Sequence, residues 1–243
     1  DIERLRNDEV YLDAVNADRI PDPTTAGDFC RRFEAGNVEE LQDVINEVRL
    51  KVWKQQDPEF FDEAIIDADG TIVPTTGECK EGMDLSYKSI WGYHTLVVSL
   101  ANTGEPLYLC NRSGSCKSSE QAAQYLDKSA ELCRQGGFKK IRFRGDTDFS
   151  QTQYLDGWDD ENITFVFGMK AMPNLVEIAE NLSETAWDSL VRPPKYIVKT
   201  EPRKKPVNVK EQIVKERGYE NIRLQSEEVA EFAYSPVKCH KSY

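Results

Sequence analysis

The first 56 residues place apolar side chains at the spacing of helices. Positions three and four apart recur in residues 3–15, in residues 24–33 and in a longer segment after Gly36, which predicts three helices. The long helix carries one apolar stripe, which we expect to be used for packing: Val38, Leu41, Val44, Ile45, Val48 and Val52. Asp57 precedes Pro58, and because the residue before a proline disfavours helix, the helical part ends there.

The pattern changes to that of strands from residue 60 onward. Apolar runs bounded by turn residues predict strands over residues 64–73, 91–101 and 105–113. The sequence Asn102-Thr103-Gly104 is a hairpin turn signal between the second and third runs. We therefore expect three consecutive strands joined as an antiparallel meander.

Helices and strands alternate after this meander. A helix is expected to begin at a Ser118 cap and to end at Gly136-Gly137. The remaining elements are a strand over residues 141–145, a short helix through Leu155 and Trp158, a strand over residues 163–168 and a helix beginning near Pro173. The predicted order is β-β-β-α-β-α-β-α, and the crossover helix makes the fourth strand parallel to the first.

Two pairs of carboxylates interrupt the apolar runs. Asp67 and Asp69 lie within the first strand, and Asp146 and Asp148 follow the fourth. Residues two apart on a strand face the same side, so Arg144 is placed to orient Asp146 or to contact a phosphate. Turn aspartates beside glycine are the structural alternative for either pair. Clustered carboxylates are costly without a cation, so the two pairs together favour metal-dependent phosphate chemistry.

One acid inside the first strand and another at the end of the fourth is the layout of the RNase H-like α/β fold, a mixed five-stranded sheet with flanking helices. The stretches IDADGTIVPTTG, SIWGYHTLVVSL, RGDTDFSQ and EEVAEFAYSPVKCHKSY resemble DDE transposases of bacterial insertion sequences, in particular the group with a β-rich insertion before the final glutamate. The resemblance runs over essentially the whole chain. It implies a helical N-terminal region (residues 1–57), a catalytic core (58–184) and a basic β-rich insertion (185–243).

The resemblance also assigns roles to the acids. It implies that Asp69, in the Asp-Gly-Thr motif, and Asp146, after Arg-Gly, are catalytic and bind metal, with Asp67, Asp148 and Arg144 in supporting positions. The implied cofactor is Mg²⁺, with Mn²⁺ as a substitute, as two ions about 3.5–4 Å apart that activate water or a 3′-hydroxyl and stabilise the leaving oxygen.

The third acid of that family is a glutamate within a Tyr, Arg, Glu, Lys signature, which this sequence lacks. We therefore expect a C-terminally truncated, catalytically incomplete fragment whose third acid lies beyond residue 243.

Charge is unevenly divided along the chain. The net charge of −12 argues against nucleic acid as a partner. Residues 190–243, however, hold 12 Lys and Arg against 7 Asp and Glu, so they carry +5 while residues 1–189 carry −17. A charge run is commonly only a solvated face, but phosphate contact is the alternative. The candidate DNA-binding residues are Lys195, Lys199, Arg203, Lys204 and Lys205.

The resemblance makes double-stranded DNA the expected partner, as transposon ends and target, with a homodimer as one option for assembly. No apolar run approaches the roughly 18 residues of a membrane span, so no membrane partner and a cytoplasmic location are expected.

Two other functions compete with a transposase that cuts and joins DNA. One is a non-catalytic transposase remnant that still binds DNA. The other is a haloacid-dehalogenase-like phosphatase, because DADGT fits its opening motif with Asp67 as nucleophile. That phosphatase needs a doubly wound parallel sheet, whereas a tight turn joins two of the expected strands here.

Overall fold

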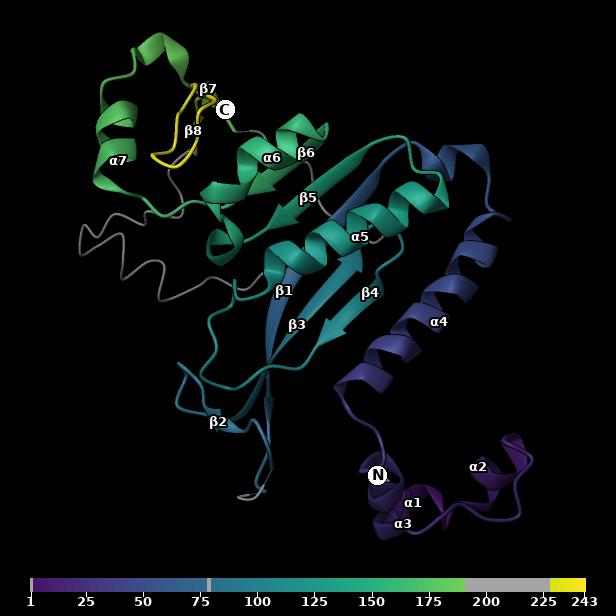
Figure 1. The fold of residues 1–243 in the computed structure, drawn as a ribbon. Coiled ribbons are helices and arrows are strands. Elements are labelled where there is room, and N and C mark those ends of the chain that lie inside the picture. Colours follow the sequence, from purple (N-terminus) through teal and green to yellow (C-terminus); the bar gives the residue numbers. More distant parts are fainter. Residues whose placement is uncertain (1, 78–79, 191–227) are drawn as a thin grey trace, which may run out of the picture. The chain divides into compact units, whose positions relative to one another are not determined.

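The computed structural model of the chain describes residues 2–77, 80–190 and 228–243. These residues fall into two compact units, residues 1–169 and residues 170–243, and each is described by itself. Figure 1 shows the elements of both units.

The N-terminal region is helical. It contains α1 (Ile2–Leu5), α2 (Glu9–Ala14), α3 (Pro23–Cys30) and α4 (Ala35–Trp53). The single helix expected over residues 3–15 is wrong, because Asp8 accepts a hydrogen bond from the Tyr11 N–H and starts a new helix there. Asp22 caps α3 by accepting a hydrogen bond from the Thr24 N–H, so this helix begins ahead of the expected residue 24. A short 3₁₀ turn, η1 (Pro58–Phe61), follows α4.

The first unit is built on one six-stranded mixed sheet. Its strands are β1 (Ala64–Pro74), β2 (Asp84–Leu85), β3 (Trp91–Leu100), β4 (Glu105–Cys110), β5 (Ile141–Gly145) and β6 (Ile163–Phe167). The order is β2-β3-β1-β5-β6, and β4 also pairs with β3. β1, β3 and β4 form an antiparallel meander, whereas β5 is parallel to β1 and β6 is parallel to β5. Apart from the two-residue strand β2, this is the expected RNase H-like sheet.

One face of the sheet is buried beneath a helix. α5 (Ala122–Gly136) crosses this face (Figure 1), and alternate residues of β1 beneath it, Ala64, Ile66 and Ala68, are buried. β5 contributes Ile141 and Phe143 to the same core. Buried and more exposed residues alternate along both strands because successive side chains point to opposite faces of the sheet. The turns η2 (Thr147–Phe149) and η3 (Thr152–Tyr154) and the helix α6 (Leu155–Asp160) connect β5 to β6.

The two ends of α5 differ in how well the sequence predicted them. Gly137 ends the helix in the left-handed conformation, at φ +102°, as the glycine pair predicted. The expected Ser118 cap is wrong, because the helix begins after Gln121, whose backbone is in the left-handed conformation. The Ser118 hydroxyl donates to Asp148 instead.

The second unit contains α7 (Pro173–Glu180), the turn η4 (Glu184–Ala186), and the short strands β7 (Asp188–Ser189) and β8 (Glu228–Val229), which pair antiparallel. Residues 191–227 of the insertion expected over residues 185–243 lie outside the described residues. Within the described part of the chain, no helix is long and apolar enough to cross a membrane.

Candidate functional site

The pairing of β1 with β5 decides how the acids are arranged. The parallel register runs from Ala64 opposite Ile141 to Asp67 opposite Arg144, a constant offset of 77 residues. The next same-face position on β1 is Asp69, and the same offset leads to Asp146. Asp146 follows β5 with extended backbone, at φ −77° and ψ −170°. The recorded pairing ends at Asp67 and Arg144, and only its continuation by two residues sets Asp69 opposite Asp146, at the spacing of about 4.7–4.9 Å between adjacent strands.

These acids lie on the sheet face opposite α5. In β1 the buried positions are even-numbered, whereas Asp67 is half-buried and Asp69 is exposed. In β5 the buried positions are odd-numbered, so Arg144 and Asp146 share the face of the β1 acids. The spacing argument from the sequence thus places all four residues on one side of the sheet.

Two of the four acids are already engaged by side chains of the protein. Asp67 accepts two hydrogen bonds from Arg144, at 2.7 Å to Nε and 2.6 Å to Nη2. This bidentate contact raises the pKa of the Arg144 guanidinium. Asp148 accepts a hydrogen bond of 2.9 Å from the hydroxyl of Ser118, which lies in the loop before α5. Arg144 therefore contacts Asp67 rather than Asp146, the residue that its strand position suggested.

Within the described ranges, Asp69 and Asp146 accept hydrogen bonds only from neighbouring backbone N–H groups. Oδ1 of Asp69 accepts from the Gly70 N–H at 2.8 Å, and Oδ1 of Asp146 accepts from the Asp148 N–H at 2.9 Å. Among the described residues, neither carboxylate forms an ion pair and neither Oδ2 accepts a hydrogen bond. Each carboxylate thus has an oxygen that accepts no hydrogen bond and has no paired cation within the part of the chain that the structure describes.

Two glycines allow close packing beside Asp69 and Asp146. Gly70 lies under the buried ring of His94, and a Cβ there would be 2.6 Å from Nε2. His94 is fixed in turn by a 2.9 Å hydrogen bond between Nδ1 and the Cys116 carbonyl. A Cβ at Gly168 would lie 3.3 Å from the carbonyl carbon of Asp146. The glycine of the Asp-Gly-Thr motif is therefore required by packing against the His94 ring.

Arg112 organises the loop between β4 and α5, and sequence reasoning missed it. Its side chain is buried, and it donates from Nε to the His94 carbonyl at 2.9 Å and from Nη1 to the carbonyls of Lys117, Ser118 and Glu120. Its Nη2 is buried without a hydrogen-bond partner among the described residues. This guanidinium therefore fixes the loop from which Ser118 contacts Asp148. The only sequence signal was a basic residue within a run of small polar residues.

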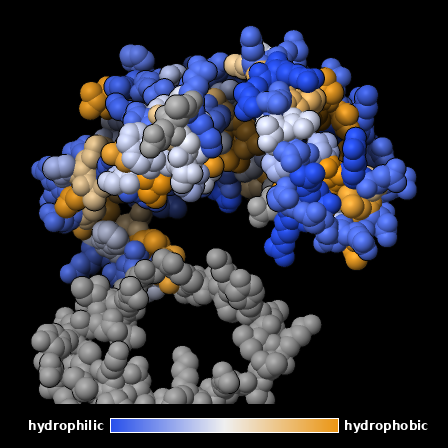
Figure 2. Space-filling model, turned by 90° about the horizontal axis from the view of Figure 1, so that it is seen from below, coloured by the Kyte–Doolittle hydropathy of each residue, from blue (hydrophilic) through white to orange (hydrophobic). Residues whose placement is uncertain are grey.

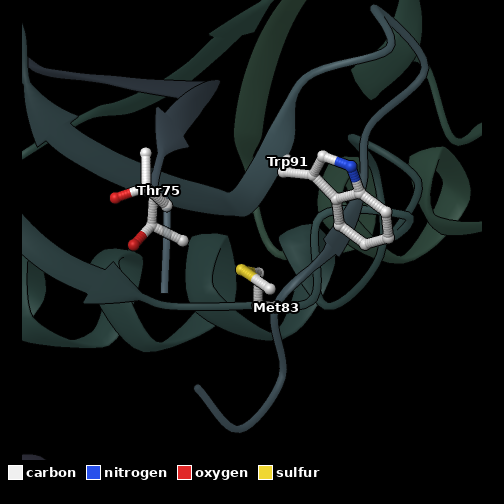
Figure 3. Close-up of a pocket in the computed structure, with 4 residues that line it drawn as sticks. Thr75, Met83 and Trp91 are labelled. Carbon is white, nitrogen blue, oxygen red and sulfur yellow. The ribbon is translucent and has the colours of Figure 1, made fainter. Parts of the chain in front are cut away.

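A separate pocket lies further along β1. It has a volume of about 640 Å³ and is lined by Thr75, Thr76, Met83 and Trp91. Figure 3 shows Thr75, Met83 and Trp91 around this pocket. Thr75 is six residues beyond Asp69, which at about 3.3 Å per residue puts the pocket roughly 20 Å from the acids. Trp91 is 55% exposed at this pocket. Trp158, by contrast, is buried in the core of the first unit and does not face solvent.

Two parts of the expected site are not found in the described structure. No group of three or more His, Cys, Asp or Glu residues that could hold a metal occurs among the described residues, so a third acid is not assigned there. The five basic candidates, Lys195, Lys199, Arg203, Lys204 and Lys205, lie outside the described residues.

The chain is similar to known proteins both in sequence and in structure. A family model described as transposase DDE domain group 1 matches residues 1–227. Among solved structures, the chain is similar to one in the cryo-EM structure of a piggyBac transposase synaptic complex with hairpin DNA, at 13% identity and a TM-score of 0.38. That match covers 54% of this chain and 29% of the other, so this chain spans less than a third of the length of that relative. No curated protein matches the chain.

Proposed function

Because the chain belongs to the group 1 family of transposase DDE domains, we propose that Asp69 and Asp146 form the metal-binding centre of a transposase that cleaves and joins DNA strands at transposon ends. The observation that supports this proposal is the β1–β5 register, which ends at Asp67 opposite Arg144 and, if continued by two residues, sets Asp69 opposite Asp146. The antiparallel meander of β1, β3 and β4 argues against the phosphatase alternative, which needs a doubly wound parallel sheet.

The donor set fits a hard divalent cation. Asp69 and Asp146 each offer a carboxylate oxygen that accepts no hydrogen bond from the described residues. Mg²⁺ prefers a few carboxylate oxygens together with water and substrate phosphate, and Mn²⁺ accepts the same ligands. When bound, such an ion lowers the pKa of a bound water and stabilises charge on phosphoryl oxygens.

The neighbouring residues have positioning roles in this proposal. The Arg144 contact holds Asp67 away from the cation, so that Asp69 is the ligand supplied by β1. The Ser118 contact fixes Asp148, whose own N–H donates to Asp146. Arg112 thus holds the loop that carries Ser118, and Ser118 in turn orients the turn that carries Asp146 and Asp148.

The proposed substrate and partner is double-stranded DNA, as transposon ends and target. The basic candidates Lys195, Lys199, Arg203, Lys204 and Lys205 supply the phosphate contacts. If all five are used, the logarithm of the DNA association constant falls with log salt with a slope of about −4.5. Replacing all five with alanine removes most of this slope, and an unchanged slope excludes them.

A non-catalytic DNA-binding remnant is the second candidate, and the absence of a three-acid group among the described residues favours it. A metal titration separates the two. Calorimetry of the whole chain with MnCl₂ is compared with the Asp69→Asn and Asp146→Asn variants and with Asp13→Asn, which removes an exposed acid of α2. The proposal predicts binding that either site variant weakens at least about tenfold and that Asp13→Asn leaves unchanged. Equal binding by all four proteins contradicts it.

A further inference from the structure

The open face of the sheet continues from the acids to the pocket beside Trp91. Residues directly opposite each other in an antiparallel pair of strands point to the same side. The β1–β3 register runs past Asp69 and sets Val73 opposite Tyr93. Two residues farther on, the Thr75 N–H donates to the Trp91 carbonyl at 3.0 Å, so the same register reaches the pocket. Thr75 and Trp91 therefore lie on the face that carries Asp69, roughly 20 Å along the strand.

The pocket combines a flat aromatic surface with small polar groups. The half-exposed indole of Trp91 forms one wall, and Met83 and Thr75 lie beside it (Figure 3). Thr75 and Thr76 bring hydroxyl groups, which can donate to a ligand or accept from it. Exposure alone would be a weak argument, because Figure 2 shows apolar residues exposed among hydrophilic ones on the face seen from below. The concave shape, with a volume of about 640 Å³, is what indicates a binding site.

Contacts within the chain shape this pocket. The Tyr93 hydroxyl donates to the Glu81 carbonyl at 3.0 Å, which ties the loop that carries Met83 to β3. A Cβ at Gly92 would clash with the Val73 carbonyl oxygen, so glycine is required for the close approach of β1 and β3 beside the pocket. The pocket is therefore formed before a ligand arrives, which lowers the entropic cost of binding.

A lysine lies at the edge of the pocket. The Lys80 ammonium donates to the Thr75 hydroxyl, and Lys80 is exposed, so a positive charge stands beside a wall residue. A flat aromatic wall, hydroxyl groups and a cation at the edge match the three parts of a nucleotide, which are the ring face, the polar ring edge and the phosphate. An apolar side chain of a protein partner would use the tryptophan and leave the cation unmatched.

We propose that this pocket binds an unpaired nucleobase of the DNA on which the acids act, with the base stacked on Trp91 and a neighbouring phosphate at Lys80. This inference rests on the proposed function, because it adds a second contact of the same DNA on the same face of the sheet. At about 3.4 Å per nucleotide of a B-form strand, a separation of roughly 20 Å puts this base about six nucleotides from the phosphate at the acids. A base stacked inside a duplex cannot offer its ring face to Trp91, so the pocket selects an unpaired one.

Fluorescence anisotropy of the whole chain with a labelled oligothymidylate tests the proposal, in EDTA so that no metal takes part. The reference ligand is an abasic strand of the same length and charge. The chain is expected to bind the strand with bases at least about tenfold more tightly. Trp91→Ala removes this preference and Trp91→Phe restores most of it, because phenylalanine keeps a ring face. Phe29→Ala, which truncates an exposed aromatic residue of α3, is the matched control and leaves the preference unchanged.

Three results overturn the proposal. These are equal affinity of the unaltered chain for the two strands, equal effects of Trp91→Ala and Phe29→Ala, and binding of thymidine monophosphate as tight as that of the strand, which assigns the pocket to a free nucleotide. The manganese titration described above tests the metal centre separately. A chain that prefers the strand with bases but binds no MnCl₂ keeps the pocket and loses the metal centre, and a chain that binds MnCl₂ without this preference does the reverse.

Discussion

Gly70→Ala is the most informative single substitution in the core of the site. The added Cβ would lie 2.6 Å from Nε2, 3.3 Å from Cδ2 and 3.5 Å from Cε1 of His94. The first distance is well inside van der Waals contact. The ring cannot move freely, because it is 2% exposed and its Nδ1 is bound to the Cys116 carbonyl at 2.9 Å. Either the ring shifts and loses that bond, or β1 moves and displaces Asp69.

The expected loss follows from these two contributions. Overpacking a filled core costs about 1–3 kcal/mol, and loss of a buried hydrogen bond adds about 1 kcal/mol. We expect the free energy of unfolding to fall by about 2–4 kcal/mol, and the melting temperature by roughly 5–15 °C for a unit of this size. Because the Gly70 N–H donates to Asp69, Mn²⁺ affinity is expected to fall as well.

Urea and thermal unfolding measure the loss, with Gly157→Ala as the control. Apart from its chain neighbours and the backbone of its own helix, no described residue comes within 4 Å of a Cβ at Gly157, and the residue lies within α6, so alanine there is neutral or stabilising. A double-mutant cycle with His94→Ala isolates the contact. Gly70→Ala is expected to be much less harmful once the ring is removed. A Gly70→Ala protein as stable as the parent, or an equal loss with and without His94, refutes the reasoning.

Three further predictions concern other parts of the first unit. Arg112→Met is expected to destabilise by about 2–3 kcal/mol, because the buried bond to the His94 carbonyl and the part-buried bond to the Ser118 carbonyl are lost, and a urea midpoint equal to that of the parent contradicts this. Arg144→Gln is expected to change stability by less than about 1 kcal/mol, since the pair with Asp67 is partly exposed, so a larger shift in melting temperature contradicts this. Burial raises the pKa of the Cys133 thiol to about 12, so mass spectrometry after alkylation at pH 8 is expected to find exposed Cys30 labelled and Cys133 unmodified; equal labelling is the contrary result.

The strands of the first unit could be predicted because their pattern is local. Apolar alternation and the Asn102-Thr103-Gly104 turn gave β3 and the start of β4, and the limits of β5 were predicted without error. The two-residue strand β2 has too little sequence to carry a pattern. The break between α1 and α2 was missed because the apolar spacing continues across it. The Asp8 side chain binds the Tyr11 N–H and starts a new helix there, which the apolar spacing alone does not reveal.

The candidate site shows a similar division. Spacing on a strand placed Asp67 with Asp69, and Arg144 with Asp146, on one face, since this depends only on a period of two. The partner of Arg144 depended on the register between β1 and β5, which are 77 residues apart, and no local pattern specifies such a register. The packing face of α4 holds the buried residues Asn46 and Trp53 and the ion pair of Arg49 with Glu105. It was missed because apolar periodicity pointed to the stripe that includes Ile45 and Val48, and these side chains are exposed in the structure.

Anomalous diffraction from crystals of this chain soaked in MnCl₂ tests the central claim most directly. The account predicts a manganese peak on the open face of the sheet, bound by carboxylate oxygens of both Asp69 and Asp146, with the Asp67–Arg144 pair intact. A peak bound by Asp67 with Asp69 left free, or manganese bound only at sites remote from these acids, would contradict it.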